Sequence, residues 1–297
     1  MSAGGRGGPA AGAAAGATAI RGGPRLRVAC VQMNTRDDVA ANRAAAVRLV
    51  EEAVAAGARF IALPETWAFK GRGAGILASA EPVDGPSNAL LADLARRHGV
   101  WVLAGSHYEP SPQPGRVYNT SALFGPDGRL HAAYRKLHLF DVVAGGTVYR
   151  ESDEVVAGDE VVTADIEADG ARLRLGLTIC YDLRFPELYR ALALRGAQVL
   201  CVPSAFTAPT GAAHWEVLVR ARAIENACFV VAPGQTGEHL PGRACWGHSM
   251  VVDPWGTVLA QLGDEVGVCV ADLDLARLGE VRERIPALRH RRPDVYG

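Results

Sequence analysis

Cys180 occupies a position in the sequence that suits a nucleophile. It ends an apolar run, RLRLGLTIC (172–180), and polar residues follow it before a helical pattern begins near Phe185. A thiol at a bend between a strand and a helix meets the positive end of the helix dipole, which lowers its pKa from about 8.5 and favours the thiolate. The alternative is a cysteine that only packs at the end of a buried strand, and both interpretations fit the local sequence.

Glu65 is a second residue whose type and position suit chemistry. It follows the apolar strand pattern RFIALP (59–64) and precedes Thr66 and Trp67. Ligands bind at the carboxyl ends of strands in α/β sheets. A carboxyl group beside Trp67 in a poorly solvated pocket is expected to have a raised pKa, which suits a general base. The alternative is an ordinary solvated carboxylate in a loop.

Lys136 stands out through composition, because only two of the 31 basic residues are lysines, Lys70 and Lys136. Arginine therefore serves where a positive charge alone is needed. A lysine at the end of the predicted strand RLHAAYRK (129–136) indicates a need for a compact ammonium group, which can stabilise a developing oxyanion. A surface position is the alternative for both lysines, and it is the interpretation we adopt for Lys70.

The elements that must position these residues alternate between apolar strand patterns and helical periodicity. Gly-rich residues 138–158 are expected to form an irregular functional loop. A three-stranded meander (246–273), a short helix and a basic tail are expected to end the chain. The pattern is typical of one α/β domain with two mixed sheets and helices outside. The other expected strands are 26–33, 59–64, 100–106, 118–125, 129–136, 172–180, 198–204 and 228–233, and the expected helices are 39–56, 87–98, 185–197 and 214–226.

Composition excludes several classes of protein. The formal net charge of −1 argues against a nucleic-acid or membrane-surface binder, because both partners favour clustered positive charge. No apolar run approaches the roughly 18 residues that would span a bilayer. The six cysteines include no C-x-x-C pair, which disfavours a metal cluster. Four cysteines lie in apolar strand patterns and are expected to be core residues: Cys30, Cys201, Cys228 and Cys269. Free thiols in this number indicate a reducing compartment, so we expect a cytoplasmic location.

Residues 1–24 differ from the rest of the chain. They hold eight glycines and eight alanines and almost no large apolar side chain. Such a segment cannot offset the entropy of ordering by burial, and it carries no secretory h-region. We therefore expect a disordered tail at 1–24, a single domain at 25–297, and the cytoplasm as the default location.

Three sequence blocks around the candidate residues resemble the signature blocks of the nitrilase superfamily of carbon–nitrogen hydrolases. The blocks are LPETW around Glu65, YRKLHLFD around Lys136 and GLTICYDLRFPELYR around Cys180. They occur in the family's order with comparable separations. The resemblance extends over about residues 26–297, which is essentially the whole chain after the tail.

The resemblance implies a four-layer αββα sandwich that pairs with a second copy across its helices. It implies an amidase that needs no cofactor and no metal. It also implies Cys180 as the nucleophile, Glu65 as the general base and then acid, and Lys136 as the partner of the oxyanion. A second glutamate follows the lysine in the family, and Glu151 in YRES is the matching position.

These groups suffice for amide hydrolysis through a thioester, which divides one difficult step into two easier ones. Cys180 would attack the carbonyl carbon while Glu65 takes its proton. Lys136 and the Tyr181 backbone N–H would hold the oxyanion. Glu65 would then protonate the leaving amine and activate water. No histidine is required, in contrast to a papain-like pair.

Three further blocks most resemble the deaminated glutathione amidase branch of the superfamily: AHWEVLVRARAIEN (213–226), WGHSMVVDPWGTV (246–258) and HRRPDVYG (290–297). The substrate implied is a small ω-amide with an anionic 2-oxo acid end. Arg184 could hold that carboxylate through a bidentate contact, or it could form a salt bridge with Glu187. Phe206 and Thr207, in the segment 204–207, are expected to line the same mouth.

Other functions remain open on the sequence. An ω-amidase acting on 2-oxoglutaramate and an N-carbamoyl amine hydrolase would use the same residues, and only the pocket distinguishes them. A non-catalytic scaffold has no need to keep Cys180, Glu65 and Lys136 together. A nucleotide-binding protein lacks support, because neither a G-x-G-x-x-G nor a P-loop run is present. The partners expected are a small-molecule amide and a second copy of the chain.

Overall fold

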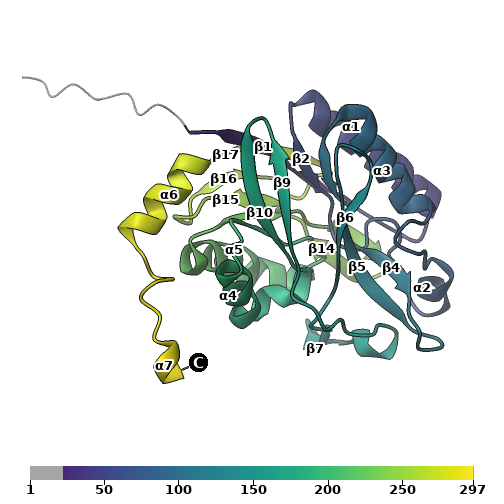
Figure 1. Ribbon diagram of the computed structural model, residues 1–297. Coiled ribbons are helices and arrows are strands. Elements are labelled where there is room, and N and C mark those ends of the chain that lie inside the picture. The colour runs from purple at the N-terminus through teal and green to yellow at the C-terminus, as the bar shows by residue number, and fades with distance from the viewer. Residues whose placement is uncertain (1–22, 297) are drawn as a thin grey trace, which may run out of the picture.

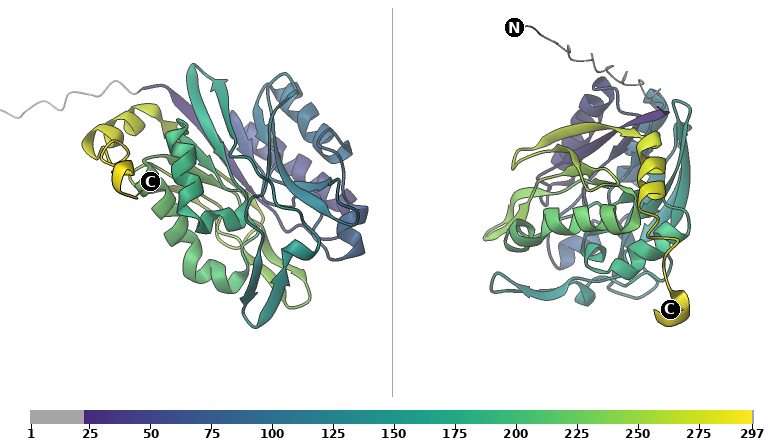
Figure 2. Two further views of the ribbon diagram at one scale, coloured as in Figure 1. Left: turned by 60° about the horizontal axis from the view of Figure 1, so that its bottom comes forward. Right: turned by 90° about the vertical axis from the view of Figure 1, so that its left-hand side faces the viewer.

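Two β-sheets stack against each other and carry helices on their outer faces, which gives four layers in the order αββα (Figure 1). The structure is a computed structural model and describes residues 23–296. The four-layer sandwich predicted from the sequence is confirmed. Figure 2 shows the two outer helix layers and the two sheets from other directions.

The first sheet has seven strands in the order β17-β1-β2-β3-β5-β4, with β6 paired to β5. Strands β1, β2 and β3 run parallel, so their carboxyl ends meet at one edge of the sheet. Its strands are β1 (Arg25–Gln32), β2 (Phe60–Ala62), β3 (Trp101–Leu103), β4 (His107–Pro110), β5 (Val117–Phe124), β6 (Leu130–Arg135) and β17 (Gly267–Asp274).

The second sheet has six strands in the order β16-β15-β12-β11-β10-β9. Strands β10, β11 and β12 are parallel and again present their carboxyl ends together. Its strands are β9 (Thr163–Ala168), β10 (Ala171–Leu177), β11 (Val199–Cys201), β12 (Phe229–Ala232), β15 (Met250–Val252) and β16 (Val258–Gln261). Two separate hairpins are β7 (Asp141–Ala144) with β8 (Thr147–Arg150), and β13 (Thr236–Leu240) with β14 (Arg243–Trp246).

The longer helices cover the outer faces of the sheets. Helices α1 and α3 pack on the first sheet, and α4 and α5 pack on the second. Asp38 begins α1 by accepting a hydrogen bond from the Ala41 N–H, and Gly99 ends α3 with a φ of 62°. The helices are α1 (Val39–Ala55), α2 (Ala74–Ala78), α3 (Pro86–His98), α4 (Pro186–Leu194), α5 (Ala208–Asn226), α6 (Leu275–Arg284) and α7 (Pro293–Tyr296).

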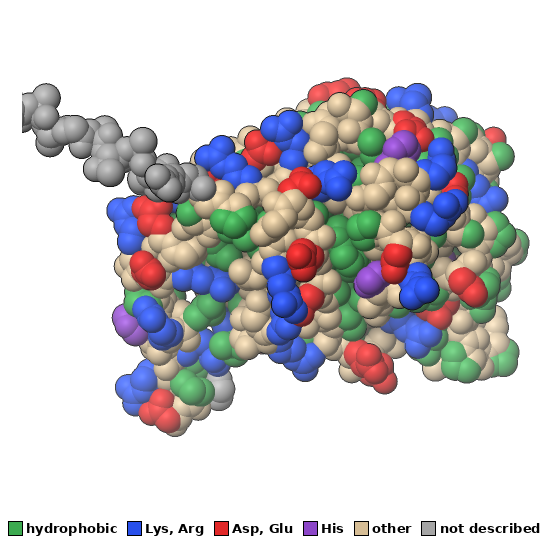
Figure 3. Space-filling model, turned by 45° about the horizontal axis from the view of Figure 1, so that its top comes forward, with side chains coloured by type: hydrophobic (Ala, Val, Ile, Leu, Met, Phe, Trp, Pro, Cys, Tyr) green, Lys and Arg blue, Asp and Glu red, His purple; other side chains and the backbone are tan. Residues whose placement is uncertain are grey.

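The principal core fills the space between the two sheets and continues beneath α4 and α5. A second apolar cluster lies between the first sheet and helices α1 and α3. Cys30, Cys201, Cys228 and Cys269 are buried, as predicted from their apolar contexts. On the face drawn in Figure 3, acidic and basic side chains are interspersed rather than gathered by sign, which agrees with the net charge near zero.

Three sequence predictions about the elements are wrong. The expected meander breaks after β16, because β17 leaves the second sheet and pairs antiparallel with β1 in the first. Residues 138–158 contain the β7–β8 hairpin and a 3-10 turn, Glu151–Asp153, instead of an irregular loop. The strand expected at 172–180 ends at Leu177, and a 3-10 turn, Cys180–Arg184, begins at the cysteine.

The tail expected at 1–24 falls almost entirely outside the described residues. Within the described part, Pro24 accepts a hydrogen bond from the Leu275 N–H, directly before β1 begins at Arg25. Helices in the described region are all too short or too polar to cross a membrane.

Truncating a core leucine should destabilise the fold far more than truncating a surface leucine. Leu103 is fully buried between the sheets, whereas Leu130 is 47% exposed. We expect Leu103→Ala to lower the free energy of unfolding by about 2–5 kcal/mol, because it leaves a cavity. Leu130→Ala should change it by about 0.5 kcal/mol or less. Urea unfolding of both variants checks this, and equal effects would contradict the described core.

Candidate active site

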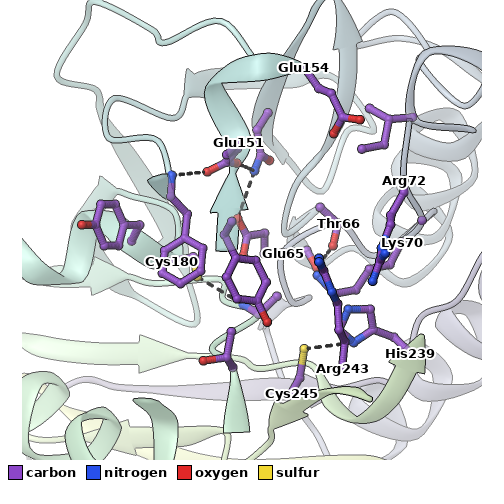
Figure 4. A pocket seen from close by; sticks show the side chains of 18 of the residues that line it. Glu65, Thr66, Lys70, Arg72, Glu151, Glu154, Cys180, His239, Arg243 and Cys245 are labelled. Carbon is purple, nitrogen blue, oxygen red and sulfur yellow. Dashed lines mark hydrogen bonds between the residues drawn. The ribbon is translucent and has the colours of Figure 1, made fainter. Parts of the chain in front are cut away.

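A cavity of about 480 Å³ opens where strands of both sheets end, and it gathers residues that lie far apart in the sequence. Glu65 follows β2, Lys136 follows β6, Glu151 follows β8 and Cys180 follows β10. All four side chains line this cavity. Figure 4 labels Glu65, Glu151 and Cys180 among them. The fold therefore brings the separate sequence motifs together at one cavity.

Cys180 sits on a sharp turn that presents its thiol to the cavity. Its φ of 47° lies in the left-handed region, which is costly for a residue with a Cβ and is often found at functional sites. The Cys180 N–H donates to the Pro203 carbonyl at 2.9 Å, which fixes the turn against the segment after β11. The Ala205 N–H points at the sulfur, with N and Sγ 3.5 Å apart.

A buried carboxylate, Asp182, holds this turn in place. Asp182 is fully buried and accepts hydrogen bonds from the Tyr134 hydroxyl at 2.6 Å and from the Ile179 N–H at 2.8 Å. It also accepts from the backbone N–H of His138 and lies 2.7 Å from that imidazole. The carboxylate thus ties the cysteine turn to the end of β6, the strand that carries Lys136.

Glu65 is fixed mainly through its backbone. The Gln235 side chain donates to the Glu65 carbonyl at 2.9 Å, and Ser106 accepts from the Thr66 N–H at 2.9 Å. Thr66 has a φ of 54°, so the chain turns sharply directly after the carboxylate. The Glu65 side chain lines the cavity, where its carboxylate accepts hydrogen bonds from Lys136 and Asn119.

The Lys136 ammonium joins the two carboxylates. Its Nζ lies 2.9 Å from Glu65 Oε1 and 2.9 Å from Glu151 Oε2, and the lysine is almost fully buried. The Phe140 N–H also donates to Glu151, at 2.7 Å. The structure therefore brings Glu151 to Lys136, at the position that the resemblance suggested.

Asn119 is a site residue that the sequence reasoning missed. Its side-chain amide donates to Glu65 at 3.0 Å and to Glu151 at 3.3 Å, and the residue is buried. It lies in the middle of β5, in the run YNTSALF, where its polar character within an apolar strand was the available signal. Asn119 holds the two carboxylates at the distance that one ammonium can bridge.

Electrostatics at this site differ from the sequence-based expectation for Cys180. Burial raises the pKa of the Cys180 thiol well above its usual range, and the negative charge of Glu65 raises it further, against an opposing effect of Lys136. The predicted lowering of this pKa by a helix dipole is wrong, because α4 begins only at Pro186, beyond the short 3-10 turn. These effects hold the Cys180 thiol in its protonated form.

The pKa of Glu65 also shifts in the direction opposite to the one expected from the sequence. Burial favours its neutral form, but the charges of Lys136 and Lys70 outweigh burial and lower the pKa of Glu65. The Glu65 carboxylate and the Cys180 thiol are close enough for each group to shift the pKa of the other. Burial alone would lower the pKa of Lys136, yet Glu151 and Glu65 hold it well above its ordinary value. The Glu65 carboxyl group is therefore ionised, whereas the Cys180 thiol is protonated.

The remaining predicted binding residues divide into two groups. Tyr181, Phe206 and Thr207 line the cavity. Arg184 is not among the lining residues: its guanidinium lies over the Tyr181 and Phe206 rings, 5.9 Å and 5.3 Å from their centroids, and contacts His214 instead of Glu187.

Lys70, which the sequence analysis placed on the surface, is half-buried and lines the cavity. The surface interpretation of Lys70 is therefore wrong. Two hairpins that were not predicted, β7–β8 and β13–β14, supply much of the remaining wall. Within residues 23–296, no cluster of three or more His, Cys, Asp or Glu side chains is arranged to hold a metal ion.

Comparison with known proteins gives matches over most of the chain. The family model described as Carbon-nitrogen hydrolase matches residues 27–283. A protein of Synechocystis sp. named Deaminated glutathione amidase is 44% identical over 265 residues, which cover 89% of this chain and 97% of that protein. The human protein named Omega-amidase NIT2 is 39% identical over 272 residues, covering 91% and 96%.

A solved structure agrees with these sequence matches. The crystal structure of the Caenorhabditis elegans NitFhit protein is similar to this fold with a TM-score of 0.84 at 41% sequence identity. The similarity covers 93% of this chain and 67% of that one.

Replacing Glu65 should make the cysteine easier to ionise. Glu65→Gln removes a negative charge that raises the pKa of Cys180, so this pKa should fall, although burial keeps it above the usual range. The pH dependence of Cys180 alkylation by iodoacetamide, followed by peptide mass spectrometry, reports the shift as a midpoint at lower pH. Glu154→Gln, in the same cavity, should leave the midpoint in place. A midpoint that stays or rises in Glu65→Gln would contradict the described electrostatics.

Proposed function

The chain belongs to the carbon–nitrogen hydrolase family, and from this premise we propose that it hydrolyses the amide of deaminated glutathione, or of a related 2-oxo acid, through a cysteine thioester. It is a hydrolase of carbon–nitrogen bonds other than peptide bonds. Deaminated glutathione is a tripeptide in which a 2-oxo group replaces the terminal amine. Cleavage of its first amide would release 2-oxoglutarate and cysteinylglycine.

One observation carries the catalytic part of the proposal. Cys180, Glu65 and Lys136 share one cavity, where the thiol meets an ionised carboxylate that is itself bound by an ammonium group. A buried ammonium between two carboxylates costs desolvation energy and adds little to stability. Such an arrangement is suited to a reaction in which a proton moves from the thiol and negative charge appears on a carbonyl oxygen.

Acylation follows from this geometry. As the Cys180 sulfur attacks the amide carbon, its proton passes to Glu65, so no free thiolate has to form in the buried site. Negative charge develops on the carbonyl oxygen, where Lys136 and the Tyr181 N–H would donate. Glu65 then gives the proton to the departing amine, which leaves the acyl group on sulfur and Glu65 ionised again.

Deacylation uses the same groups in the reverse order. Glu65 takes a proton from water as the water oxygen attacks the thioester carbon. The second tetrahedral oxyanion is held by the same donors. Its collapse expels the Cys180 sulfur, which recovers the proton from Glu65, and the carboxylic acid is released. Glu151 acts as a positioning residue throughout, because both of its carboxylate oxygens accept hydrogen bonds from the Lys136 ammonium.

A second candidate is ω-amidase activity on 2-oxoglutaramate. A relative named Omega-amidase NIT2 matches this chain over nearly its full length. The acyl group transferred to Cys180 would be the same, and ammonia would replace cysteinylglycine as the leaving group. Tyr181, Phe206 and Thr207 would contact the acyl chain in both cases.

The test is formation of 2-oxoglutarate from deaminated glutathione and from 2-oxoglutaramate, measured side by side. We expect higher kcat/KM for the tripeptide. Cys180→Ala and Glu65→Gln should each lower it by at least about 1,000-fold without unfolding the protein, because each removes a group that reacts. Preference for 2-oxoglutaramate would favour the second candidate, and near-full activity of Cys180→Ala would refute the thioester mechanism.

We propose in addition that the chain forms a homodimer through α5. Val217 and Ile224 lie two turns apart on this helix, and they are 69% and 54% exposed. Residues seven apart share one helix face, so α5 presents an apolar stripe away from its own sheet. Burial of this stripe by the same stripe of a second copy would form a two-fold interface.

Charge placed on this stripe should separate the subunits. Val217→Arg with Ile224→Arg puts like charges opposite each other across the two-fold axis. We expect sedimentation velocity to show a dimer for the parent protein and a monomer for this variant. A parent protein that sediments as a monomer, or a variant that remains dimeric, would rule out this interface.

The location we propose is a reducing compartment such as the cytoplasm. All six cysteines are free thiols. Cys30 and Cys269 stand directly opposite each other on β1 and β17 and still carry no disulfide. Free thiols in such numbers are typical of proteins in a reducing environment.

A further inference from the structure

Three cations line a part of the active-site cavity that the proposed mechanism does not use. Lys70 and Arg72 come from the segment between β2 and α2, and Arg243 comes from the start of β14. Figure 4 shows them gathered around His239, on the other side of Glu65 from Cys180. We call Lys70, Arg72 and Arg243 the basic wall.

The basic wall has no internal counterion. Among residues 23–296, no carboxylate lies within 4.0 Å of a charged nitrogen of Lys70, Arg72 or Arg243, whereas Lys136 has two such partners. Glu154, which also lines the cavity, accepts a hydrogen bond from the Gly73 N–H at 2.7 Å. Arg243 instead stacks on Tyr149, with 4.8 Å between the guanidinium carbon and the ring centroid.

The positive potential of the wall acts on its neighbours. Burial lowers the pKa of His239 to about 3, and the charges of Lys70, Arg243 and Arg72 all contribute to that lowering. His239 is therefore neutral and can donate or accept without adding charge. Lys70 also lowers the pKa of Glu65, so the wall lies within electrostatic range of the reacting groups.

Three converging and uncompensated cations are unfavourable in a protein whose charges are otherwise balanced. They repel one another, and Lys70 and Arg243 are half-buried, so water screens them incompletely. A bound anion would remove this repulsion. Arginine and lysine are the side chains that bind carboxylates most strongly, through charge-assisted hydrogen bonds.

We propose that Lys70, Arg72 and Arg243 form a carboxylate-binding subsite, which holds a non-reacting carboxylate of the substrate while the amide carbon lies at Cys180. This inference rests on the proposed amidase function and adds the groups that select an anionic substrate. It assigns to the basic wall the role that the sequence suggested for Arg184, which lies outside the cavity.

The chemistry allows two sources for the carboxylate. In 2-oxoglutaramate the carboxylate belongs to the acyl part, which stays on the cysteine. Deaminated glutathione carries that group and a second carboxylate on its leaving dipeptide. In both cases the subsite would lower KM for anionic amides and leave neutral amides unaffected.

The first experiment compares turnover by Lys70→Met, Arg243→Met and the double variant. Each single change should lower kcat/KM for 2-oxoglutaramate or deaminated glutathione about 10-fold, mainly through KM, and the double change about 100-fold. In Arg243→Met, turnover of a neutral amide, propionamide, should change about two-fold at most, whereas Lys70→Met also removes a charge that lowers the pKa of Glu65. Lys70→Arg keeps the charge and should restore most of the loss.

A matched control separates a local effect from the loss of protein charge. Arg129 lies at the surface with 85% of its side chain exposed. Arg129→Met therefore removes the same unit of charge at a position where water screens it. This variant should leave kcat/KM unchanged for both anionic and neutral substrates. Equal losses for anionic and neutral amides in Arg243→Met would overturn the proposal.

A second experiment measures binding without turnover. In a Cys180→Ala background, calorimetric titration with 2-oxoglutarate reports on the acyl-side carboxylate, and titration with cysteinylglycine reports on the leaving-group carboxylate. About 10-fold weaker binding of one ligand in Lys70→Met and Arg243→Met would support the subsite and identify which carboxylate it holds. Unchanged affinities, or no binding of either ligand, would overturn it. If the parent protein is inactive but the Cys180→Ala protein still binds one of these ligands through Lys70 and Arg243, the proposed amidase function is refuted and the anion subsite is supported.

Discussion

The ammonium of Lys136 between the carboxylates of Glu65 and Glu151 is the interaction on which the site depends. It joins the ends of three separate segments, and Asn119 ties the same two carboxylates from β5. Because an unpaired charge at this depth is very unfavourable, no member of the group can leave without a large cost. The first sheet thus carries a fixed electrostatic centre, and the second sheet brings Cys180 to it.

This centre explains why the pKa values of Cys180 and Glu65, the proposed nucleophile and base, oppose proton transfer from the thiol to the carboxylate at rest. Burial and Glu65 keep the thiol protonated, while Lys136 and Lys70 keep Glu65 ionised. The thiol is therefore protected from unselective reactions. In the proposed mechanism, proton transfer would become favourable when a substrate carbonyl accepts the negative charge beside Lys136, so activation of the thiol would be coupled to the presence of the substrate.

The sequence predicted the elements with strong local patterns and the residues with unusual context. β1, α1 and α3 lie close to where apolar periodicity and capping residues placed them, and the rarity of lysine pointed to Lys136. The exchange of β17 between sheets was not predictable, because local patterns do not encode the strand's partner. The directions predicted for the pKa shifts of Cys180 and Glu65 were wrong, since these shifts depend on burial and on charges from distant segments. The predicted surface position of Lys70 was wrong because its burial likewise depends on segments distant in the sequence.

The most direct test of the central claim is the charge state of Lys136. The chain has only two lysines, so protein labelled with 13C-lysine gives two side-chain signals, and Lys70→Met assigns them. If Glu65 and Glu151 hold the ammonium as described, the Lys136 13Cε signal should stay at its protonated position through pH 10.4, about the ordinary lysine pKa. A signal that titrates at or below that pH would show that Lys136 is not bound by two ionised carboxylates, and the account of the site would fail.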